Sequence, residues 1–503
     1  MLGEKRRFHR HGGTVYLTGG ILAIANISSV CAAPVPAKSA DSFVDSIGVN
    51  VHLTYGGTPY EKFEDLIKPK LKELGIRHIR DEAYQEENFF HKVKSLASDG
   101  IKATLIFSGN PPSEVVATAK KLSGAIEAIE GPNESDLEIF NFAYKGQKFP
   151  VGTRTYQKEM YAAVKGDAAT KNLPVVLPSM GWGQNAELMG KLNSAGDYCN
   201  LHSYPNIGQP PTIDLDSYFI PHIKNMCGSS LPMWATETGY HNVISNELGI
   251  SDGAAGKYIP RLLLGNFKRN IESTYLYELA NQGTDSNDEQ SNFGLLRFDG
   301  SPKPAFTAIK NMNSLLKERS AKFTPQSLDY EIEGDKQGIE TVLLQKSNGD
   351  YYLILWQETK SWDNDSKKDI NVPNKKVKVS LKNSAKKLET YDPTKSISAL
   401  NAEASAKAID ISVPDYPVIL RIDTNGTQRQ PLSSESQKQP TSSADQKSQP
   451  QPSSTEQLSP SAMPPKQSTS AGDEAEVEAE VETSSQSESV EQLQPIQAES
   501  VEN

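Results

Sequence analysis

The chain has 503 residues, and its 63 Asp and Glu outnumber its 52 Lys and Arg, so the formal net charge is −11. The sequence pI is about 5.4. This acidic balance argues against a nucleic-acid partner, because proteins that bind nucleic acids carry a basic patch or stripe. The length is too great for one ordinary domain and no repeat of diagnostic period occurs, so we expect several different domains in succession.

The first 37 residues predict a secretory signal peptide. Basic residues at positions 5, 6, 7 and 10 precede an apolar stretch from Val15 to Val30, and small residues between Ala32 and Ala37 offer a cleavage site. An uncleaved membrane anchor is the alternative, but the stretch is short for a membrane span and is interrupted by glycines and polar residues. We therefore expect a secreted or extracytoplasmic protein, in the periplasm or at the cell surface, without stable membrane insertion after cleavage.

Residues 38–325 predict a (β/α)8 barrel. Eight apolar, strand-like runs alternate with segments of helical periodicity, such as the one that places Phe63, Ile67, Leu71 and Leu74 on one face. The runs are Ile47–Leu53, Ile76–Arg80, Ile101–Phe107, Ala125–Glu130, Pro174–Met180, Tyr198–His202, Met233–Thr236 and Thr274–Leu279. Eight alternating units match a closed barrel better than a doubly wound open sheet, which is the alternative.

Two cysteines remain after the predicted signal peptide. Cys199 lies on the opposite face of its strand from His202, so it faces the helical layer if His202 faces the barrel axis. Cys227 is expected in that helical layer. The two could form a disulfide in an oxidising compartment, or they could be two buried free thiols.

The pattern changes to alternation with period two after residue 325. Residues 326–422 predict a small antiparallel β-sandwich, with strands such as Tyr351–Trp356 and Val418–Ile422 separated by Asn, Gly, Asp and Lys turns. Residues 423–503 are rich in Ser, Gln, Pro and Glu and include the acidic run Asp473–Glu482. Such a segment cannot bury enough apolar surface to fold, so we expect a disordered acidic tail.

Two glutamates mark the candidate active site. Glu134 follows the fourth strand-like run in the segment Gly131-Pro132-Asn133-Glu134, and Glu237 follows the seventh. The C-terminal ends of barrel strands converge on one pocket, so both carboxylates are expected there. The other polar residues at the strand ends are acidic, aromatic or amide-bearing. This composition suits cleavage of a glycosidic bond, which needs two carboxyl groups and aromatic faces against which sugar rings stack.

At these positions the sequence resembles the retaining glycoside hydrolases of clan A, whose members include families 5 and 39. The resemblance covers residues 46–320. It rests on Asn133-Glu134 at the fourth run, Glu237-Thr238-Gly239 at the seventh, His202-Ser203-Tyr204 at the sixth and Arg80 at the second. It implies that Glu134 is the acid/base and Glu237 the nucleophile. The chain departs from many clan members at the eighth strand, where they carry a Trp and this sequence reads Tyr277-Glu278.

The remaining candidate residues are expected to bind the substrate. The resemblance implies that Asn133 binds a sugar 2-hydroxyl, and His202 and Tyr204 are expected in the pocket. Trp182 and Tyr55 are loop aromatics for sugar stacking. Arg80 either orients a carboxylate or forms a structural salt bridge with Asp81 or Glu82. Glu278 either binds a sugar hydroxyl or pairs with Arg80.

These observations predict a secreted retaining glycosidase acting on an oligo- or polysaccharide. A negative neighbour is expected to favour a protonated Glu134, whereas donors such as Tyr204 or Arg80 keep Glu237 ionised. The chemistry requires no cofactor, and no metal-ligand spacing occurs in the sequence. We expect a monomer. A non-catalytic carbohydrate-binding protein and a transglycosylase that uses the same two glutamates are the alternatives.

Overall fold

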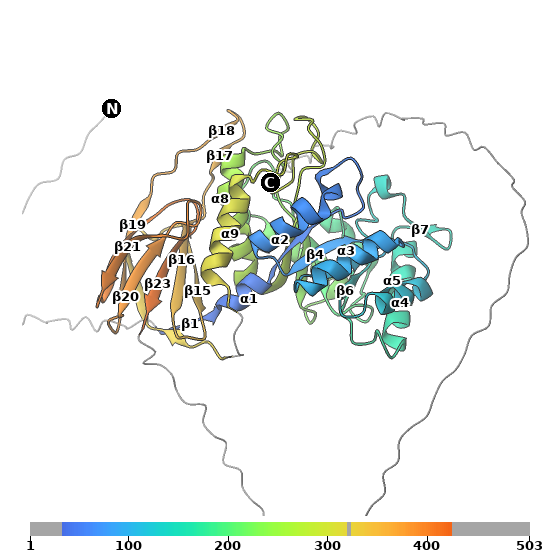
Figure 1. Cartoon of the computed structure of the whole chain (residues 1–503), viewed down its shortest axis with the longest axis horizontal. Helices are drawn as coiled ribbons and strands as arrows, with labels where there is room; N and C mark the ends of the chain where they lie inside the picture. The colour runs from blue at the N-terminus through green and yellow to red at the C-terminus, as the bar shows by residue number, and fades with distance from the viewer. Residues whose placement is uncertain (1–32, 319–322, 425–503) are drawn as a thin grey trace, which may run out of the picture. The chain divides into compact units, whose positions relative to one another are not determined.

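Eight parallel strands form a barrel, around which Figure 1 shows helices such as α2 (Lys68–Leu74), α3 (Glu87–Ser98) and α5 (Val151–Gly166). The structure is a computed structural model that describes residues 33–318 and 323–424. The barrel strands are β3 (Ile47–Asn50), β4 (His78–Glu82), β5 (Lys102–Ile106), β6 (Ile126–Glu130), β9 (Val175–Val176), β10 (Cys199–His202), β11 (Met233–Thr238) and β12 (Ile271–Leu276). They pair in the order β10-β11-β12-β3-β4-β5-β6-β9. A parallel bridge between Val176 and Tyr198 joins the two edges. The predicted barrel is confirmed, and the open sheet is wrong.

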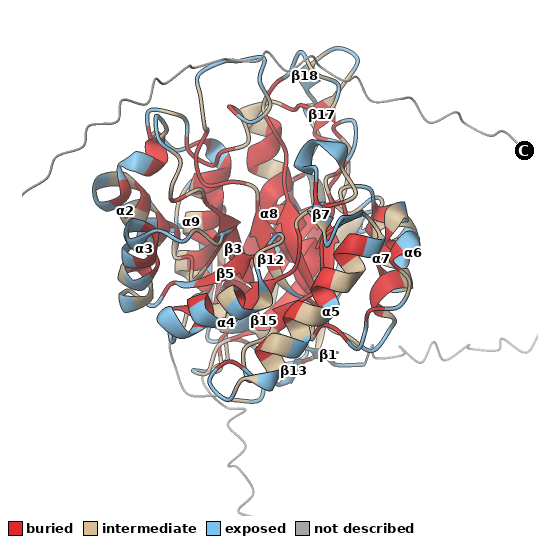
Figure 2. Ribbon diagram, turned by 90° about the vertical axis from the view of Figure 1, so that its right-hand side faces the viewer, coloured by how far each residue is buried: buried red, intermediate tan, exposed pale blue. Residues whose placement is uncertain are grey.

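Amphipathic helices surround the strands because each buries one face against the sheet. In α3, for example, Phe89, Val93 and Leu96 are buried, and Figure 2 shows the buried barrel with helices whose outer residues are exposed. The helices are α1 (Ala40–Asp45), α2 (Lys68–Leu74), α3 (Glu87–Ser98), α4 (Pro112–Lys121), α5 (Val151–Gly166), α6 (Ala186–Met189), α7 (Ile220–Cys227), α8 (Asp252–Lys268) and α9 (Pro304–Leu316). None of the helices in the described part of the chain has the length and apolar character needed to cross a bilayer.

Large side chains fill the interior of the barrel below the strand ends. Tyr275 on β12 is fully buried, and its hydroxyl lies 2.9 Å from Thr104 Oγ1 and 2.9 Å from Glu127 Oε1. Its ring occupies the space beside Gly48 on β3, where an added Cβ would lie only 2.3 Å from Tyr275 Cδ1. The packed interior therefore closes the bottom of the barrel and restricts any ligand site to the upper end.

Antiparallel sheets follow the barrel, as the sequence predicts. One sheet has the order β14-β19-β22 and the other β2-β15-β16-β23-β20-β21. The strands after the barrel are β13 (Ser327–Leu328), β14 (Tyr330–Gly334), β15 (Ile339–Gln345), β16 (Tyr351–Gln357), β17 (Trp362–Asp363), β18 (Lys368–Asp369), β19 (Lys375–Leu381), β20 (Lys387–Tyr391), β21 (Ala399–Ala404), β22 (Ala408–Val413) and β23 (Val418–Asp423). The two larger sheets share a core that includes Tyr351, Leu353 and Ile411.

The first described residues belong to these sheets and not to the barrel. β1 (Val35–Pro36) pairs with β13, and β2 (Lys38–Ser39) pairs in parallel with β15. The sequence pattern places residues 35–37 in the predicted signal peptide and residues 38 and 39 at the start of the predicted barrel. The charged and apolar stretches of the predicted signal peptide, and nearly all of the predicted acidic tail, lie outside the described residues.

The barrel and the sandwich share packed surface through α8. This helix is buried on nearly all sides, which is typical of a helix placed between two layers. Its Arg261 is fully buried and lies 3.0 Å from Glu358 Oε1, and Lys257 Nζ lies 2.9 Å from Asp415 Oδ2. Apolar residues of the sandwich such as Trp356 belong to the same core cluster as the barrel helices. The sandwich therefore supports the barrel on this side.

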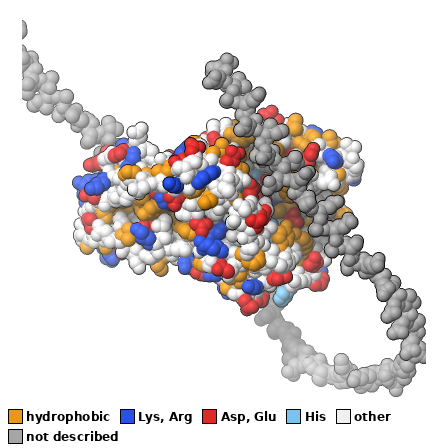
Figure 3. All heavy atoms as spheres, turned by 90° about the horizontal axis from the view of Figure 1, so that it is seen from above, with side chains coloured by type: hydrophobic (Ala, Val, Ile, Leu, Met, Phe, Trp, Pro, Cys, Tyr) orange, Lys and Arg blue, Asp and Glu red, His pale blue; other side chains and the backbone are white. Residues whose placement is uncertain are grey.

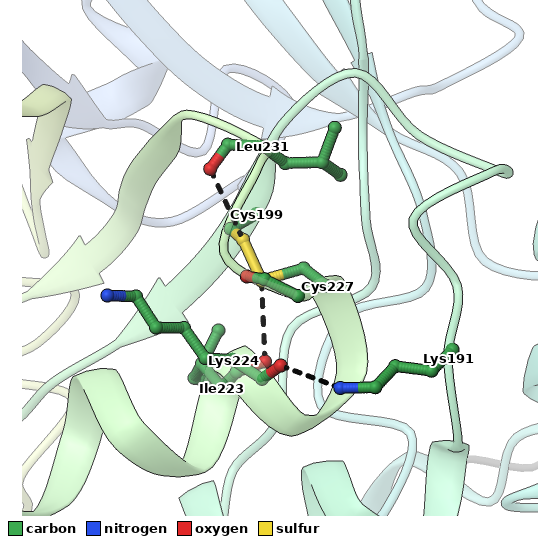
Figure 4. The surroundings of a disulfide bond; sticks show 7 residues. Lys191, Cys199, Ile223, Lys224, Cys227 and Leu231 are labelled. Carbon is green, nitrogen blue, oxygen red and sulfur yellow. Dashed lines mark hydrogen bonds between the residues drawn. A yellow bond between two sulfur atoms is a disulfide. The ribbon is translucent and has the colours of Figure 1, made fainter.

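A disulfide joins Cys199 on β10 to Cys227 at the end of α7 (Figure 4). Both cysteines belong to an apolar cluster that β10 forms with the surrounding helices. The predicted orientation is confirmed, because Cys199 faces the helices while His202 on the same strand faces the carboxylates of the pocket. The cross-link ties the sixth barrel strand to its following helix.

Removal of this cross-link should lower stability without changing the fold. A closed segment with a sequence separation of 28 corresponds to about 3–4 kcal/mol in the chain-entropy treatment. We expect Cys199→Ser/Cys227→Ser to lose about this amount in urea denaturation. Dithiothreitol should lower the stability of the wild type to the same level and leave the double variant unchanged. Equal stability of the wild type and the double variant in oxidising buffer would contradict the cross-link.

Candidate functional site

Arg80 occupies the centre of the polar network at the C-terminal end of the barrel. It lies on β4 and is 1% exposed. Nε and Nη2 donate to the two carboxylate oxygens of Glu130 at 2.7 Å each. Nη1 donates to Asn50 at 2.8 Å and to Glu237 at 2.6 Å, and Nη2 also donates to Asn133 at 2.8 Å. All five N–H groups of the guanidinium therefore end on protein oxygens.

Glu237 lies on β11 and accepts hydrogen bonds on both carboxylate oxygens. Arg80 Nη1 donates to Oε1, and the Tyr204 hydroxyl donates to Oε2 at 2.7 Å. Burial alone would raise the pKa of Glu237, but the charges of His202 and Arg80 and the hydrogen bonds from Tyr204 and Arg80 outweigh burial and lower the pKa below its ordinary value. Glu237 is therefore held as a carboxylate, as predicted.

Glu134 follows β6 in a strained turn. Its φ of 37° is in the left-handed region that few residues other than glycine adopt. Two backbone hydrogen bonds hold this conformation: the Glu134 N–H donates to Ser179 Oγ at 3.0 Å, and the Leu137 N–H donates to the Glu134 carbonyl at 2.9 Å. Glu134 Oε1 lies 2.7 Å from His202 Nδ1. The side chain therefore has a fixed partner that differs from those of Glu237.

His202 connects the two glutamates. Its Nδ1 lies 2.7 Å from Glu134 Oε1 and 3.7 Å from Glu237 Oε2, while Nε2 lies 3.0 Å from Thr236 Oγ1. Burial would lower the pKa of His202, but Glu237 and Glu134 raise it above its ordinary value. Carboxylate and imidazole atoms of Glu134, His202 and Glu237 all lie within 4.8 Å of one another. These three side chains are also the one group of the described residues with the spacing of a metal site.

A cavity of about 410 Å³ opens above this network. Seven of the nine predicted site residues line it: Tyr55, Arg80, Asn133, Glu134, Trp182, Tyr204 and Glu237. His202 lies just beneath the lining and contacts both catalytic candidates. Trp182 is 52% exposed at the rim, and Asp136 positions its loop by accepting hydrogen bonds from the N–H groups of Gly181 and Trp182 at 2.9 Å each. Tyr55 stacks on His52 with a centroid distance of 4.3 Å.

Glu278 was expected either to bind a sugar hydroxyl in the cavity or to pair with Arg80, and the structure places it in neither position. It is fully buried behind the cavity wall, and it does not contact Arg80. Tyr60 donates to Oε2 at 2.8 Å and Gln282 donates to Oε1 at 3.0 Å. Burial raises the pKa of Glu278 to about 8, and burial lowers the pKa of the adjacent His52 to about 4. The 3.3 Å approach of His52 Nε2 to Glu278 Oε2 is therefore a contact between two neutral groups at pH 7, not an ion pair.

Several residues of the site have no assigned role in the sequence analysis. Glu130 is fully buried, pairs with Arg80 through both oxygens and also accepts from Asn200 at 2.9 Å. Arg80 thus pairs with Glu130 and Glu237, not with Asp81 or Glu82. A carboxylate within an apolar strand, four residues before Glu134, is the signal that could have identified Glu130. His241, Glu289 and Phe293 also line the cavity.

Comparisons with known proteins identify the fold. No protein-family model and no curated protein matches the chain. A solved family 39 glycoside hydrolase from Bacteroides cellulosilyticus WH2 is similar, with a TM-score of 0.52 and 16% identity over 77% of this chain and 83% of that chain. A solved glucosidase from Croceicoccus marinus has a TM-score of 0.53 and 9% identity over 77% of this chain and 96% of that chain. The predicted resemblance to the glycoside hydrolase barrels is confirmed at the level of the fold.

Loss of the Arg80 cation should destabilise the protein strongly. Arg80→Met leaves the carboxylates of Glu130 and Glu237 buried without a cation, which costs about 3–5 kcal/mol. Arg77→Met is the matched control, because Arg77 precedes the same strand and pairs with Asp41 and Asp45 near the surface. There we expect a loss of about 1 kcal/mol or less. Urea denaturation measures both losses, and equal values would contradict the central role of Arg80.

Proposed function

We propose that the protein is a retaining glycosidase that cleaves an O-glycosidic bond by double displacement. The observation that carries this proposal is the pair formed by Glu134 and Glu237, which come from the fourth and seventh barrel strands and line the same cavity. Carboxylate oxygens of the two lie within 4.8 Å of each other. Retaining enzymes need about 5–5.5 Å between these groups, whereas inverting enzymes need about 6.5–9.5 Å to admit a water molecule between them.

In the first step Glu237 attacks the anomeric carbon. A covalent ester forms between this carbon and a Glu237 oxygen, while the bond from the anomeric carbon to the leaving oxygen breaks. Glu134 donates its proton to that oxygen, so the leaving group departs as an alcohol. The lowered pKa of Glu237 keeps the nucleophile ionised for this attack.

In the second step Glu134 acts as a base. It removes a proton from a water molecule, whose oxygen attacks the anomeric carbon and displaces Glu237 as a carboxylate. His202 Nδ1 contacts Glu134 and fixes its position in both steps. The carbonyl oxygen of Asn133 accepts from Arg80 and Ser179, so its NH2 group is the part left to bind a sugar hydroxyl.

The disulfide supports the proposal that the protein acts outside the cytoplasm. Disulfides persist in oxidising compartments such as the periplasm and the extracellular space. The Cys199–Cys227 bond and the predicted signal peptide therefore both support export of the protein from the cytoplasm. A non-catalytic binding protein is the weaker candidate, because it has no need of two carboxylates held so close together.

Substitution of the two glutamates tests the proposed roles. Glu237→Gln should abolish turnover, because the amide is not a nucleophile. Glu134→Gln should slow hydrolysis by about 10²–10⁴-fold for natural glycosides, with a much smaller effect on the first step for a dinitrophenyl glycoside, whose leaving group needs no proton. Proton NMR of the first product should show retention of the anomeric configuration. Inversion, or turnover by Glu237→Gln, would contradict the mechanism, and longer sugar products would indicate transglycosylation.

The acid side of the pH profile should depend on Tyr204. The profile of kcat/KM should fall as Glu237 is protonated, below the ordinary pKa of a glutamate. Tyr204→Phe removes a donor that lowers the pKa of Glu237, so this fall in kcat/KM should move to higher pH.

The lowered pKa of Glu237 also makes the stability of the fold depend on pH. Because this pKa is lower in the folded state than in the unfolded state, Glu237 contributes its full stabilisation above its unfolded pKa. The contribution is lost as the pH falls through the folded pKa.

Tyr240→Phe provides the matched control for that pH measurement. Tyr240 also lines the cavity, but its hydroxyl donates to the Gln209 carbonyl at 2.8 Å and does not reach Glu237. We expect the acid side of the kcat/KM profile of Tyr240→Phe to match that of the wild type. Identical shifts in the two variants would mean that general changes of the cavity, and not the bond to Glu237, set the profile.

A further inference from the structure

Acidic side chains outnumber basic ones along the cavity. Five carboxylic acids line it, namely Asp81, Glu82, Glu134, Glu237 and Glu289. Arg80 is the one Lys or Arg among the described residues of the lining. Since Glu130, Glu237, Asn50 and Asn133 already accept all five of its N–H groups, Arg80 has no donor left for a charged group of a substrate.

The two histidines that line the cavity, His52 and His241, do not supply the missing positive charge. Burial lowers the pKa of His52 to about 4. Burial and the charge of Lys303 lower the pKa of His241 to about 4. Both are therefore neutral at pH 7. The two ring nitrogens of His202 are already occupied by Glu134 and Thr236. A carboxylate or sulfate on the substrate would meet acidic groups and find no free cation in the described lining.

His241 does, however, offer an unused hydrogen-bond donor. The ring is 3% exposed, and its Nδ1 accepts from the Val243 N–H at 3.3 Å, so the proton of the neutral ring lies on Nε2. Nε2 is buried without a hydrogen-bond partner in the described structure. The nearest carboxylate, Glu289 Oε1, is 3.8 Å away, which is too far for a hydrogen bond. His241 is part of the cavity wall, so its unpaired Nε2–H is the donor that a turn of the ring would offer to an acceptor on a ligand.

Glu289 supplies the complementary acceptor beside it. Its Oε1 accepts from Asn246 Nδ2 at 2.6 Å, and its side chain is 43% exposed. A carboxylate has room for further donors after this one bond. A neutral donor and a carboxylate 3.8 Å apart match two neighbouring hydroxyl groups of one sugar ring, since each hydroxyl can both donate and accept.

We propose that the substrate is an uncharged glycan and that His241 and Glu289 are specificity-determining residues that bind hydroxyl groups of one of its sugars. His241 donates through Nε2–H to a sugar oxygen, and Glu289 accepts from a sugar hydroxyl. The carboxylates of Glu82, Glu237 and Glu289 disfavour uronic acid and sulfated sugars. This inference rests on the proposed glycosidase function and adds the charge class of the sugar.

A binding measurement with the full-length Glu237→Gln variant tests the charge class without turnover. Affinity electrophoresis would compare gels that contain laminarin, xylan or mannan with gels that contain polygalacturonate or alginate. We expect retardation by at least one neutral polysaccharide and by neither anionic one. Retardation by an anionic polysaccharide alone, or by none of the five, would overturn the inference.

A charge reversal at Glu289 tests the residue assignment. With matched neutral hexosides and uronides as substrates, Glu289→Lys should raise KM for the neutral substrate and lower the neutral-to-uronide ratio of kcat/KM at least tenfold. Glu247→Lys is the control, because it makes the same change of charge on a nearby exposed residue that does not line the cavity. His241→Ala should raise KM with little change in kcat. Equal ratios in the two lysine variants would overturn the assignment.

The outcomes separate this inference from the proposed function. If the wild type cleaves uronides as fast as neutral glycosides while Glu237→Gln is inactive, the double displacement stands and the charge class is wrong. If Glu237→Gln retains full turnover, the proposed mechanism fails whatever the charge of the sugar. Acidic and basic side chains are interspersed over the face of the molecule that Figure 3 shows, and the Glu247→Lys control accounts for a change of surface charge outside the cavity.

Discussion

The buried guanidinium of Arg80 determines how the C-terminal end of the barrel is built. Removing a cation from water costs several kcal/mol unless every N–H finds an acceptor, and Arg80 meets this requirement with oxygens of Glu130, Glu237, Asn50 and Asn133. These acceptors come from β6, β11, β3 and the turn after β6. One side chain on β4 therefore holds the ends of three other strands in register, and any shift of a strand end would leave a charge without its partner.

The same network gives the two glutamates different environments. Glu237 contacts the Arg80 cation and the Tyr204 hydroxyl, which stabilise its ionised form. Glu134 is outside the reach of Arg80 and contacts His202, in a turn whose backbone strain is offset by the hydrogen bond to Ser179. Two carboxylic acids within 4.8 Å cannot both be ionised without cost. The charges of His202 and Arg80 and the hydrogen bonds from Tyr204 and Arg80 lower the pKa of Glu237, so this glutamate is the one held as a carboxylate.

The sequence locates the strand ends but only part of the pairing between them, since Arg80 and Tyr204 were expected as donors to Glu237 and Glu130 was not expected at all. Eight apolar runs with Glu134 and Glu237 after the fourth and seventh suffice to bring the pair together, because the C-terminal ends of barrel strands converge. Arg80 was expected either to orient a carboxylate or to pair with Asp81 or Glu82. The structure has the first arrangement, with Glu237 157 residues away, and adds Glu130, 50 residues away, which the sequence did not indicate. Which charges meet across a barrel depends on strand tilt and register, which hydrophobic periodicity does not report. The segment of residues 35–39 is too short to show a hydrophobic period, so its pairing with strands of the sandwich could not be predicted from the sequence either.

Glu278 shows how burial can keep a carboxyl group uncharged beside the candidate site. It ends the eighth strand, where an ionised group would add a second negative charge close to Glu237. Burial instead raises its pKa to about 8, and burial lowers the pKa of its neighbour His52 to about 4. At neutral pH the pair contributes polar atoms without net charge, and its hydrogen bonds with Tyr60 and Gln282 keep it fixed. Glu278 therefore adds no second negative charge beside Glu237, whose pKa the charges of His202 and Arg80 lower.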